Sequence, residues 1–162
     1  MPSFSLSNVN WAKTRRSVLA GLCGTAAHSL LMFMKNQTGV LPEFQPYDDL
    51  QRALSSIAGT SVHPTVTWLL TFVNGALILG TLFGQIYPVL PGRQPWQKGL
   101  FFGLCAWAAM GFVFFPLLGR GIFAAKLGLG IAPAVFMLAM MLSYSVTMSL
   151  IYRALKSPPS AR

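Results

Sequence analysis

The sequence predicts an all-α protein, an integral membrane four-helix bundle, and three observations carry that prediction. First, four apolar stretches are each long enough to cross a hydrocarbon core of about 30 Å, which takes about 20 helical residues. Second, none of these stretches contains an acidic residue. Third, only 9% of the 162 residues are charged, whereas a soluble domain usually has about 25%. The expected spans are residues 17–35, 64–88, 99–118 and 127–152.

Lysines and arginines flank these spans unequally. Eight lie on the side of both termini, and four lie on the other side together with all three acidic residues. The positive-inside rule therefore predicts a multi-pass membrane protein with both termini in the cytoplasm. Residues 1–16 would be a cytoplasmic segment, 17–152 the transmembrane domain and 153–162 a cytoplasmic tail. Because the basic residues border the spans, the net charge of +9 indicates contact with anionic headgroups and not with nucleic acid.

The loop after the first span contains an amphipathic segment at residues 47–58. Leu50, Ala53, Leu54 and Ile57 are three or four residues apart, and Gly59 follows as a helix-ending residue. This spacing predicts a short interfacial helix at the outer membrane surface. Docking of a partner is the alternative interpretation of the same apolar face.

Parts of the first two spans recur in the last two. Gly21-Leu22-Cys23 returns 82 residues later as Gly103-Leu104-Cys105, and Ile86-Tyr87 returns as Ile151-Tyr152. We therefore consider that two helical hairpins were duplicated, as parallel repeats related by an axis along the membrane normal. Chance similarity is the alternative, because Gly, Ala and Leu are abundant in all membrane helices.

Small residues indicate which helix faces pack together. Lipid supplies no hydrophobic drive between helices, so close approach at small side chains carries the packing signal. The glycines expected at the bundle centre are Gly24, Gly80, Gly84, Gly99 and Gly103. Four aromatic residues of the third span are expected to face lipid or a neighbouring protein, namely Phe101, Phe112, Phe114 and Phe115.

Three polar residues inside the spans are candidates for binding a ligand or fixing helix register: His28, Asn74 and Tyr144. His28 and Asn74 lie near mid-depth, about 16 Å from the inner end and about 15 Å from the outer end of their spans, and can meet across the hairpin. The plainer interpretation is an interhelical hydrogen bond, worth about 0.6 kcal/mol on average. The sharper interpretation is an anchor for a quinone headgroup or a haem ligand.

Haem is not expected, because the only other histidine, His63, lies about 10 Å shallower than His28. Cys23 and Cys105 are not spaced as metal ligands, so no metal site is predicted. The sequence also lacks a phosphate-binding loop, a nucleophile elbow and an HExxH motif, so no catalytic residues and no enzymatic activity are predicted.

Several short motifs between residues 15 and 153 resemble an uncharacterised bacterial family of four-pass membrane proteins. Among them are Leu41-Pro42-Glu43-Phe44, Leu90-Pro91-Gly92 and Gly99-Leu100-Phe101-Phe102-Gly103 followed by Ala106-Trp107. The resemblance implies a four-pass topology in a bacterial inner membrane. It implies no particular activity.

These features favour a non-catalytic accessory subunit of a larger membrane complex, of the respiratory or photosynthetic electron-transport kind. Its partners would be membrane lipids and other integral membrane subunits, and its role would be helix contacts and the packing of bound lipid or quinone. The alternative is a small transporter or channel acting as a homo-oligomer, which normally needs a membrane-embedded charge or a broken helix. A haem- or quinone-binding membrane protein is a third interpretation.

Overall fold

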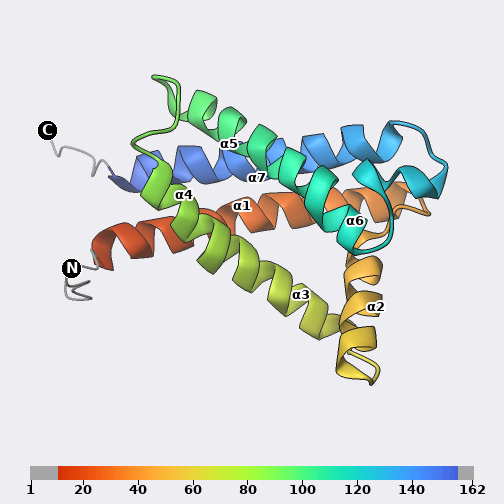
Figure 1. The fold of residues 1–162 in the computed structure, drawn as a ribbon. Helices are drawn as coiled ribbons and strands as arrows, with labels where there is room; N and C mark the ends of the chain where they lie inside the picture. Colours follow the sequence, from red (N-terminus) through yellow and green to blue (C-terminus); the bar gives the residue numbers. More distant parts are fainter. Residues whose placement is uncertain (1–10, 157–162) are drawn as a thin grey trace, which may run out of the picture.

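The computed structural model describes residues 11–156, and every regular element in that range is helical (Figure 1). Four of its helical stretches are long and apolar enough to cross a membrane: Trp11–Thr38, Pro64–Ile86, Pro95–Leu117 and Ala132–Lys156. The predicted all-α membrane fold with four spans is therefore confirmed. Residues 1–10 and 157–162, which make up most of the two predicted terminal segments, lie outside the described residues.

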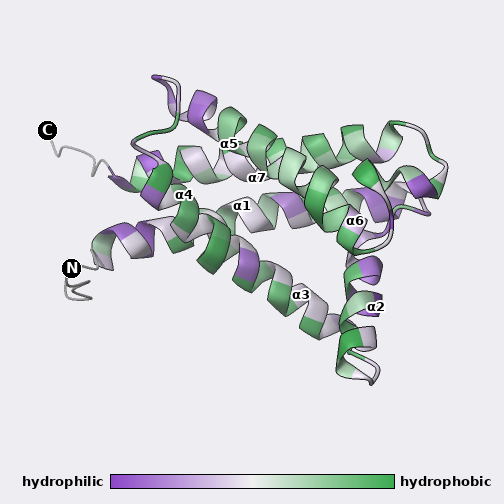
Figure 2. Ribbon diagram, in the orientation of Figure 1, coloured by the Kyte–Doolittle hydropathy of each residue, from purple (hydrophilic) through white to green (hydrophobic). Residues whose placement is uncertain are grey.

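Two of the four spans are interrupted by π-helical turns. The elements in chain order are α1 (Trp11–Thr38), α2 (Pro46–Ala58), α3 (Pro64–Val73), η2 (Asn74–Leu79), α4 (Gly80–Ile86), α5 (Pro95–Ala109), η3 (Met110–Phe114), α6 (Phe115–Leu117), η4 (Ile122–Leu127) and α7 (Ala132–Lys156). The second span is thus α3, η2 and α4, and the third span is α5, η3 and α6. Hydrophobic residues follow the spans, and hydrophilic residues gather toward the helix ends (Figure 2).

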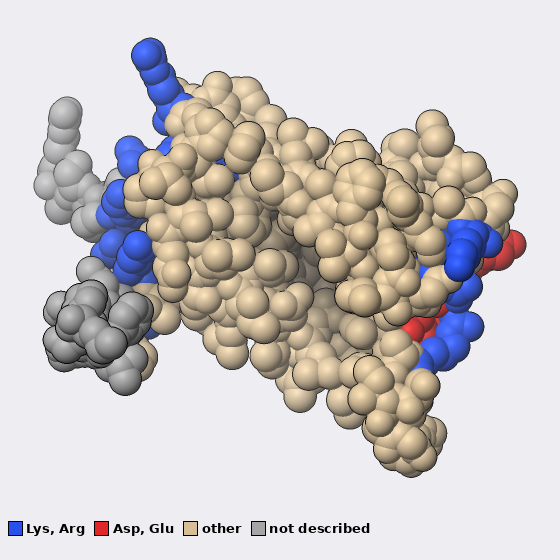
Figure 3. Space-filling view, in the orientation of Figure 1, with Lys and Arg blue, Asp and Glu red and all other residues tan. Residues whose placement is uncertain are grey.

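The bundle has two distinct ends. We call the end where α1 begins and α7 finishes the terminal end, and the opposite end the loop end (Figure 1). Lysine and arginine side chains gather at the terminal end, and acidic side chains lie only at the loop end among the residues visible in this view (Figure 3). The loop end holds α2 and η4.

The helix bounds differ by a few residues from the expected spans, and the largest differences are at the starts of the first and last helices. The first helix begins at Trp11, so Lys13, Arg15 and Arg16 lie within it; long basic side chains at a helix end can reach the headgroups. The last helix begins at Ala132, because the preceding segment turns sharply through glycines and two other residues with positive φ, Phe123 and Ala124. Pro133 consequently sits in the first turn of α7, where its missing N–H leaves no hydrogen bond unmade.

Helix α7 packs against both α1 and α5, and η2 and α4 pack against α1. The terminal half of the molecule is closed by aromatic side chains around Phe83. Its ring centroid is 5.3 Å from that of Tyr87 and 5.1 Å from that of Phe102. All three side chains are buried. This half of the bundle therefore has a well-packed core.

The structure places the five packing glycines in buried positions at helix contacts. A β-carbon on Gly24 would lie 2.7 Å from the carbonyl oxygen of Tyr144 on α7. A β-carbon on Gly99 would lie 2.8 Å from the carbonyl oxygen of Ser145 on the same helix. Because both neighbours are backbone atoms, neither helix pair can accept a larger residue without moving apart. Gly80, Gly84 and Gly103 also face atoms of a neighbouring helix.

The two hairpins use corresponding positions for their closest contacts. In the first hairpin, Ser17 on α1 meets Gly80 and Gly84 on α4. In the second, Gly99 on α5 meets Ser145 and Ser149 on α7. Shifting the first helix of the hairpin by 82 residues and the second by 65 converts one set of positions into the other. The serine and the glycines have exchanged sides, but the helices touch at the same places.

The serine hydroxyls follow the same correspondence. Ser17 donates a hydrogen bond to the carbonyl oxygen of Lys13 at 2.8 Å. Ser149 donates to the carbonyl oxygen of Pro95, which is 82 residues after Lys13. These shared contacts are the ones that a duplicated hairpin predicts.

One aromatic residue of the third span does not face lipid as expected. Phe115 is only 1% exposed, and its ring centroid lies 5.7 Å from that of Phe44 in the loop before α2. The π-helical turn η3 explains the difference, because one additional residue rotates the following side chains by about 100° relative to a regular helix. Phe101 and Phe112 are exposed, and Phe114 is half-buried.

Helix α2 lies at the loop end and is attached to the bundle by a buried ion pair. The Asp49 side chain is 3% exposed and accepts hydrogen bonds from Arg120, including one from Nε at 3.0 Å. This hydrogen bonding raises the pKa of Arg120, so its guanidinium stays charged. Arg52 also pairs with Asp49, but its side chain is 66% exposed. The ion pair with Arg120 fixes α2 beside the turn that follows α6.

Candidate functional site

A cavity of about 680 Å³ lies in the loop half of the membrane-spanning region. Helices α1 and α7 form its back, the second and third spans form its sides, and α2 with its preceding loop covers its loop end. The space-filling view shows the surface hollowed between the second and third spans (Figure 3). All three sequence-predicted candidates, His28, Asn74 and Tyr144, line this cavity. No hydrogen bond between His28 and Asn74 is formed among the described residues.

The cavity exists because the second span leaves the bundle in its loop half. Small residues at Gly75, Ala76 and Gly80 bring η2 and α4 close to α1. Helix α3 contains no glycine or alanine. Apart from its contacts with η2, it packs mainly against α2 and, more sparsely, against α1 (Figure 1). A side therefore stays open between α3 and α6. The volume falls within the range of about 300–1,000 Å³ that is common for small-molecule sites.

A hydrogen bond from Tyr144 holds the second span at its π-helical turn. The Tyr144 hydroxyl donates to the carbonyl oxygen of Gly75 at 2.6 Å. Gly75 is the second residue of η2, where the wider turn changes the regular carbonyl pairing, and such turns occur frequently at functional sites. Tyr144 thus links α7 to the point at which the second span bends away.

Tyr144→Phe is expected to lower the free energy of unfolding by about 1 kcal/mol, because it removes the hydrogen bond to Gly75 and leaves a buried carbonyl without that donor. Tyr152→Phe is the matched control, since the Tyr152 hydroxyl lies 3.5 Å from the carbonyl oxygen of Gly84 and contributes less. Thermal unfolding of both variants in one detergent measures the difference. Equal losses of stability would contradict the role of the Tyr144 bond.

Asn74 presents an unsatisfied amide to the cavity. It is the first residue of η2, it is exposed and lines the cavity, and its amide has no hydrogen-bond partner within residues 11–156. It lies about 15 Å along the helix from the start of the span at Pro64, well inside the hydrocarbon. Burying an amide there without a partner costs about 1–3 kcal/mol on protein-based scales. The position therefore favours a ligand that can hydrogen-bond.

His28 lies at a similar depth on α1, about 15 Å along the helix from its end at Thr38. Its imidazole lies near the backbone of Met140 on α7. Its ring is in edge contact with that of Tyr47, with centroids 6.4 Å apart at 88°. His28 is thus held from two sides and still lines the cavity.

Aromatic rings close the loop end of the cavity. Tyr47 on α2 stacks on Trp68 of α3 with ring centroids 4.7 Å apart. Its hydroxyl lies near that of Ser29 on α1, and both hydroxyls are buried without a hydrogen-bond partner within residues 11–156. Burial raises the pKa of the Tyr47 phenol, so the group stays neutral near physiological pH. Three helices therefore meet at Tyr47, and α2 forms the roof of the site.

Among the polar residues that line the cavity, Thr25, Tyr47 and Thr71 were not singled out from the sequence. Thr25 lies one turn before His28, and it touches Gly75 on the second span. Its spacing of three residues from His28 places both on one face of the helix, and this was the signal in the sequence. Tyr47 lies three residues before Leu50 on the apolar face of α2, and this face turned out to cover the cavity. The methionines at the back of the cavity, Met137, Met140 and Met141, supply a polarizable apolar wall.

The remaining chemistry-bearing residues lie elsewhere. Within residues 11–156 no group of three or more His, Cys, Asp and Glu side chains is placed to hold a metal ion. Cys23 and Cys105 are free thiols on exposed helix surfaces. His63 precedes α3 and accepts a hydrogen bond from the backbone N–H of Thr65 at 3.3 Å. It thus serves as a helix cap.

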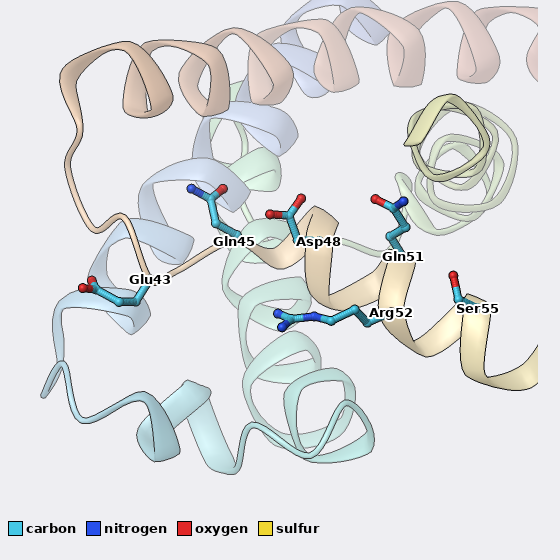
Figure 4. Close-up of a pocket in the computed structure, with 6 residues that line it drawn as sticks. All are labelled: Glu43, Gln45, Asp48, Gln51, Arg52 and Ser55. Carbon is cyan, nitrogen blue, oxygen red and sulfur yellow. The ribbon is translucent and has the colours of Figure 1, made fainter. Parts of the chain in front are cut away.

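A second hollow, of about 510 Å³, lies on the polar surface around α2 (Figure 4). Its lining is charged or amide-bearing: Glu43, Gln45, Asp48, Gln51, Arg52 and Ser55. Glu43 stands apart from the others on the loop before α2 (Figure 4). This arrangement is typical of a solvated surface, and it shares no lining residue with the intramembrane cavity.

The fold and the cavity define the class of protein: a four-span helical membrane protein with an apolar site open toward the hydrocarbon. Residues 11–162 match the family described as "Family of unknown function (DUF6789)", and the chain belongs to that family. No curated protein and no solved structure matches the chain.

Proposed function

We propose that this protein is non-catalytic and holds one neutral lipophilic molecule inside the membrane, as an accessory subunit of a larger membrane complex. The observation that carries the proposal is Asn74, which lines an apolar cavity at mid-depth and whose amide has no hydrogen-bond partner in the described part of the chain. A polar group in hydrocarbon at such a depth is a marker of function. A lipophilic ligand with one hydrogen-bonding group would supply the missing partner.

The lining indicates the charge and the shape of this ligand. None of the described residues around the cavity is a lysine, arginine, aspartate or glutamate. A charged headgroup would find no counter-ion there, so a neutral molecule is favoured. The open side between α3 and α6 faces the bilayer, so the molecule would enter from the lipid. A quinone has these properties, which is why we propose an electron-transport complex, respiratory or photosynthetic, as the setting.

Filling the cavity tests the binding part of this proposal. Ala109 lines the cavity, and Ala139 is exposed on α7 outside it. We expect the wild-type protein, purified in mild detergent, to retain a neutral lipid that mass spectrometry detects in a fixed ratio. Ala109→Trp should reduce that ratio about tenfold, and Ala139→Trp should leave it unchanged. Equal lipid content in the two variants, or none in the wild type, would refute the proposal.

The exposed apolar side of the third span supports a partner subunit. Phe112 and Leu117 are 60% and 80% exposed on that span, where large side chains can pack against another membrane helix as well as against lipid. We expect gentle solubilisation of native membranes to yield larger membrane subunits eluting with this chain in a fixed ratio. A homogeneous homo-oligomer in every mild detergent would contradict the subunit role.

The distribution of charge supports both termini lying in the cytoplasm of a bacterial inner membrane. The terminal end carries seven of the described basic residues, and the loop end carries four together with the three acids. This asymmetry follows the positive-inside rule. We expect Ser61→Cys at the loop end to react with a membrane-impermeant maleimide in intact spheroplasts. Gln94→Cys, between the second and third spans, should react only after lysis, and the reverse pattern would invert the topology.

A further inference from the structure

We infer that α2, α3 and the loop between them, residues 46–73, form one arm that swings at the π-helical turn η2, and that the ion pair between Asp49 and Arg120 is the latch that limits this movement. The inference rests on the proposed function, because it describes how the neutral lipophilic molecule of the cavity exchanges with the bilayer. It follows from how the arm is built, hinged and attached.

Helices α2 and α3 are joined to each other at three places. The ring of Tyr47 stacks on that of Trp68, with centroids 4.7 Å apart. The Nε2 atom of Gln51 on α2 donates a hydrogen bond to the carbonyl oxygen of Val62 at 2.7 Å. The backbone N–H of Val62 donates in turn to the hydroxyl of Ser55 on α2 at 2.9 Å. The two helices meet at an angle away from the bundle (Figure 1), and these contacts let them move as one body.

The arm is hinged at both of its ends. At one end is η2, and a helix bends most readily at such a turn because its regular carbonyl pairing is interrupted there. The hydrogen bond from the Tyr144 hydroxyl to the carbonyl oxygen of Gly75 holds this turn on α7, so the movement is confined to the part beyond it. At the other end, residues 39–45 connect α1 to α2 without a helix. Such a connection absorbs the changes in φ and ψ that a swing requires.

The contact between the arm and α1 leaves buried hydroxyls unpaired. The hydroxyls of Tyr47 on the arm and Ser29 on α1 lie near each other, and both are buried without a hydrogen-bond partner. The hydroxyl of Thr67 on the arm is a third such group. In the described part of the chain only one other buried side-chain nitrogen or oxygen lacks a partner, that of Lys35. Because unpaired buried hydroxyls destabilise a contact, the arm is held against α1 less firmly than a fully paired helix would be.

The latch joins the arm to the opposite side of the opening. Asp49 is on α2, and Arg120 follows α6, which borders the opening across from α3. The carboxylate of Asp49 accepts hydrogen bonds from Nε of Arg120 at 3.0 Å and from its Nη2, and paired contacts of this kind are strong and directional. Among the hydrogen bonds and ion pairs between side chains of residues 11–156, it is the only link from α2 or α3 to the third span. Releasing it lets the arm move away from α6 and widens the opening.

Distances between spin labels test this movement without any ligand. One label is attached at Ile57 on the arm and the other at Leu117 at the end of α6, two side chains that are 86% and 80% exposed. The native thiols are first removed by Cys23→Ala and Cys105→Ala. A second pair of labels, at Leu30 on α1 and again at Leu117, reports whether the bundle itself has changed.

The unlatched variant is Asp49→Asn, which keeps the size of the side chain and removes its charge. We expect it to lengthen and broaden the distance from Ile57 to Leu117 and to leave the distance from Leu30 to Leu117 unchanged. Asp48→Asn is the matched control, because Asp48 is the exposed acid next to it on the same helix, and both distances should stay as they were. An unchanged arm distance in Asp49→Asn, or an equal change in both pairs, would overturn the inference.

The exchange of decylubiquinone, a neutral lipophilic molecule, tests what the movement is for. Bound tritiated decylubiquinone should leave the Asp49→Asn protein in detergent about tenfold faster than the unaltered protein, the effect of about 1.4 kcal/mol on the latch. Asp48→Asn should release it at the unaltered rate. Equal rates in the two variants would overturn the arm as a gate and leave the proposed function standing. No saturable binding to the unaltered protein would overturn both.

A covalent latch should have the opposite effect. Asp49→Cys and Arg120→Cys are combined in the protein without native thiols and joined by a short bis-maleimide. The same protein treated with N-ethylmaleimide carries both adducts unjoined and is the control. We expect decylubiquinone to leave the joined protein about tenfold more slowly than the unjoined one, the same factor as for the opened latch. Equal rates would show that this position does not control the opening, which would overturn the inference.

Discussion

Replacing Asp49 with leucine is expected to lower the free energy of unfolding by about 3 kcal/mol or more. The Asp49 side chain is 3% exposed and pairs with Arg120, which is itself 27% exposed. Removing one partner of a buried ion pair costs about 3–5 kcal/mol, and the lower end applies here because the Arg120 guanidinium that remains is partly solvated. We expect α2 to detach from the turn after α6. The loss is measured by thermal unfolding in detergent.

Two further variants separate the buried pair from the surface charge. Arg52→Ala should cost less than about 1 kcal/mol, because the Arg52 side chain is 66% exposed and its ion pair is screened by water. Replacing both Asp49 and Arg120 with leucine should recover part of the loss, since no buried charge is then left alone. Similar losses for Asp49→Leu and Arg52→Ala would show that the pair with Arg120 contributes little.

The membrane fold could be predicted from the sequence because hydrocarbon imposes a strict condition on a chain. Every backbone group must bond internally, so long apolar stretches without acids have few alternatives to a helix. The four spans followed from that condition. The amphipathic face of residues 47–58 also predicted a helix, and the structure has α2 at Pro46–Ala58.

The packing of the spans was harder to predict from the sequence, because it depends on contacts between residues that are far apart in the chain. Asp49 looked like an ordinary charge in the first turn of a surface helix. Its buried partner Arg120 is 71 residues away, and no local pattern connects the two. The π-helical turns η2 and η3 likewise left no signal in the hydrophobic periodicity. They redirect α3 and bury Phe115, and they account for the main differences from the expected arrangement.

The candidate site was partly visible for a physical reason. His28, Asn74 and Tyr144 stand out because polar groups are rare within apolar spans. That all three line one cavity depends on the divergence of α3 from the bundle, which sequence spacing does not encode. Thr25 was overlooked because a threonine in a membrane helix usually bonds its own backbone, as it does here.

The contact between α1 and α7 governs both the stability and the site, and Gly24→Leu tests it. A β-carbon at Gly24 would lie 2.7 Å from the Tyr144 carbonyl oxygen and 2.9 Å from Cδ2 of its ring. The backbone of α7 cannot yield as a side-chain tip can, so the helices must separate. We expect a loss of about 3 kcal/mol in the free energy of unfolding, the upper part of the usual range for overpacking.

Ala26→Leu provides the matched control for this substitution. Ala26 is on the same helix two residues further on and is exposed, so a leucine there meets lipid, and stability should change by less than about 0.5 kcal/mol. In Gly24→Leu, displacement of Tyr144 should also break its hydrogen bond to Gly75, so retained lipid should fall together with stability. If Gly24→Leu unfolds at the temperature of Ala26→Leu and keeps its lipid, then α1 and α7 do not touch at this level, and the back wall of the cavity is wrongly placed.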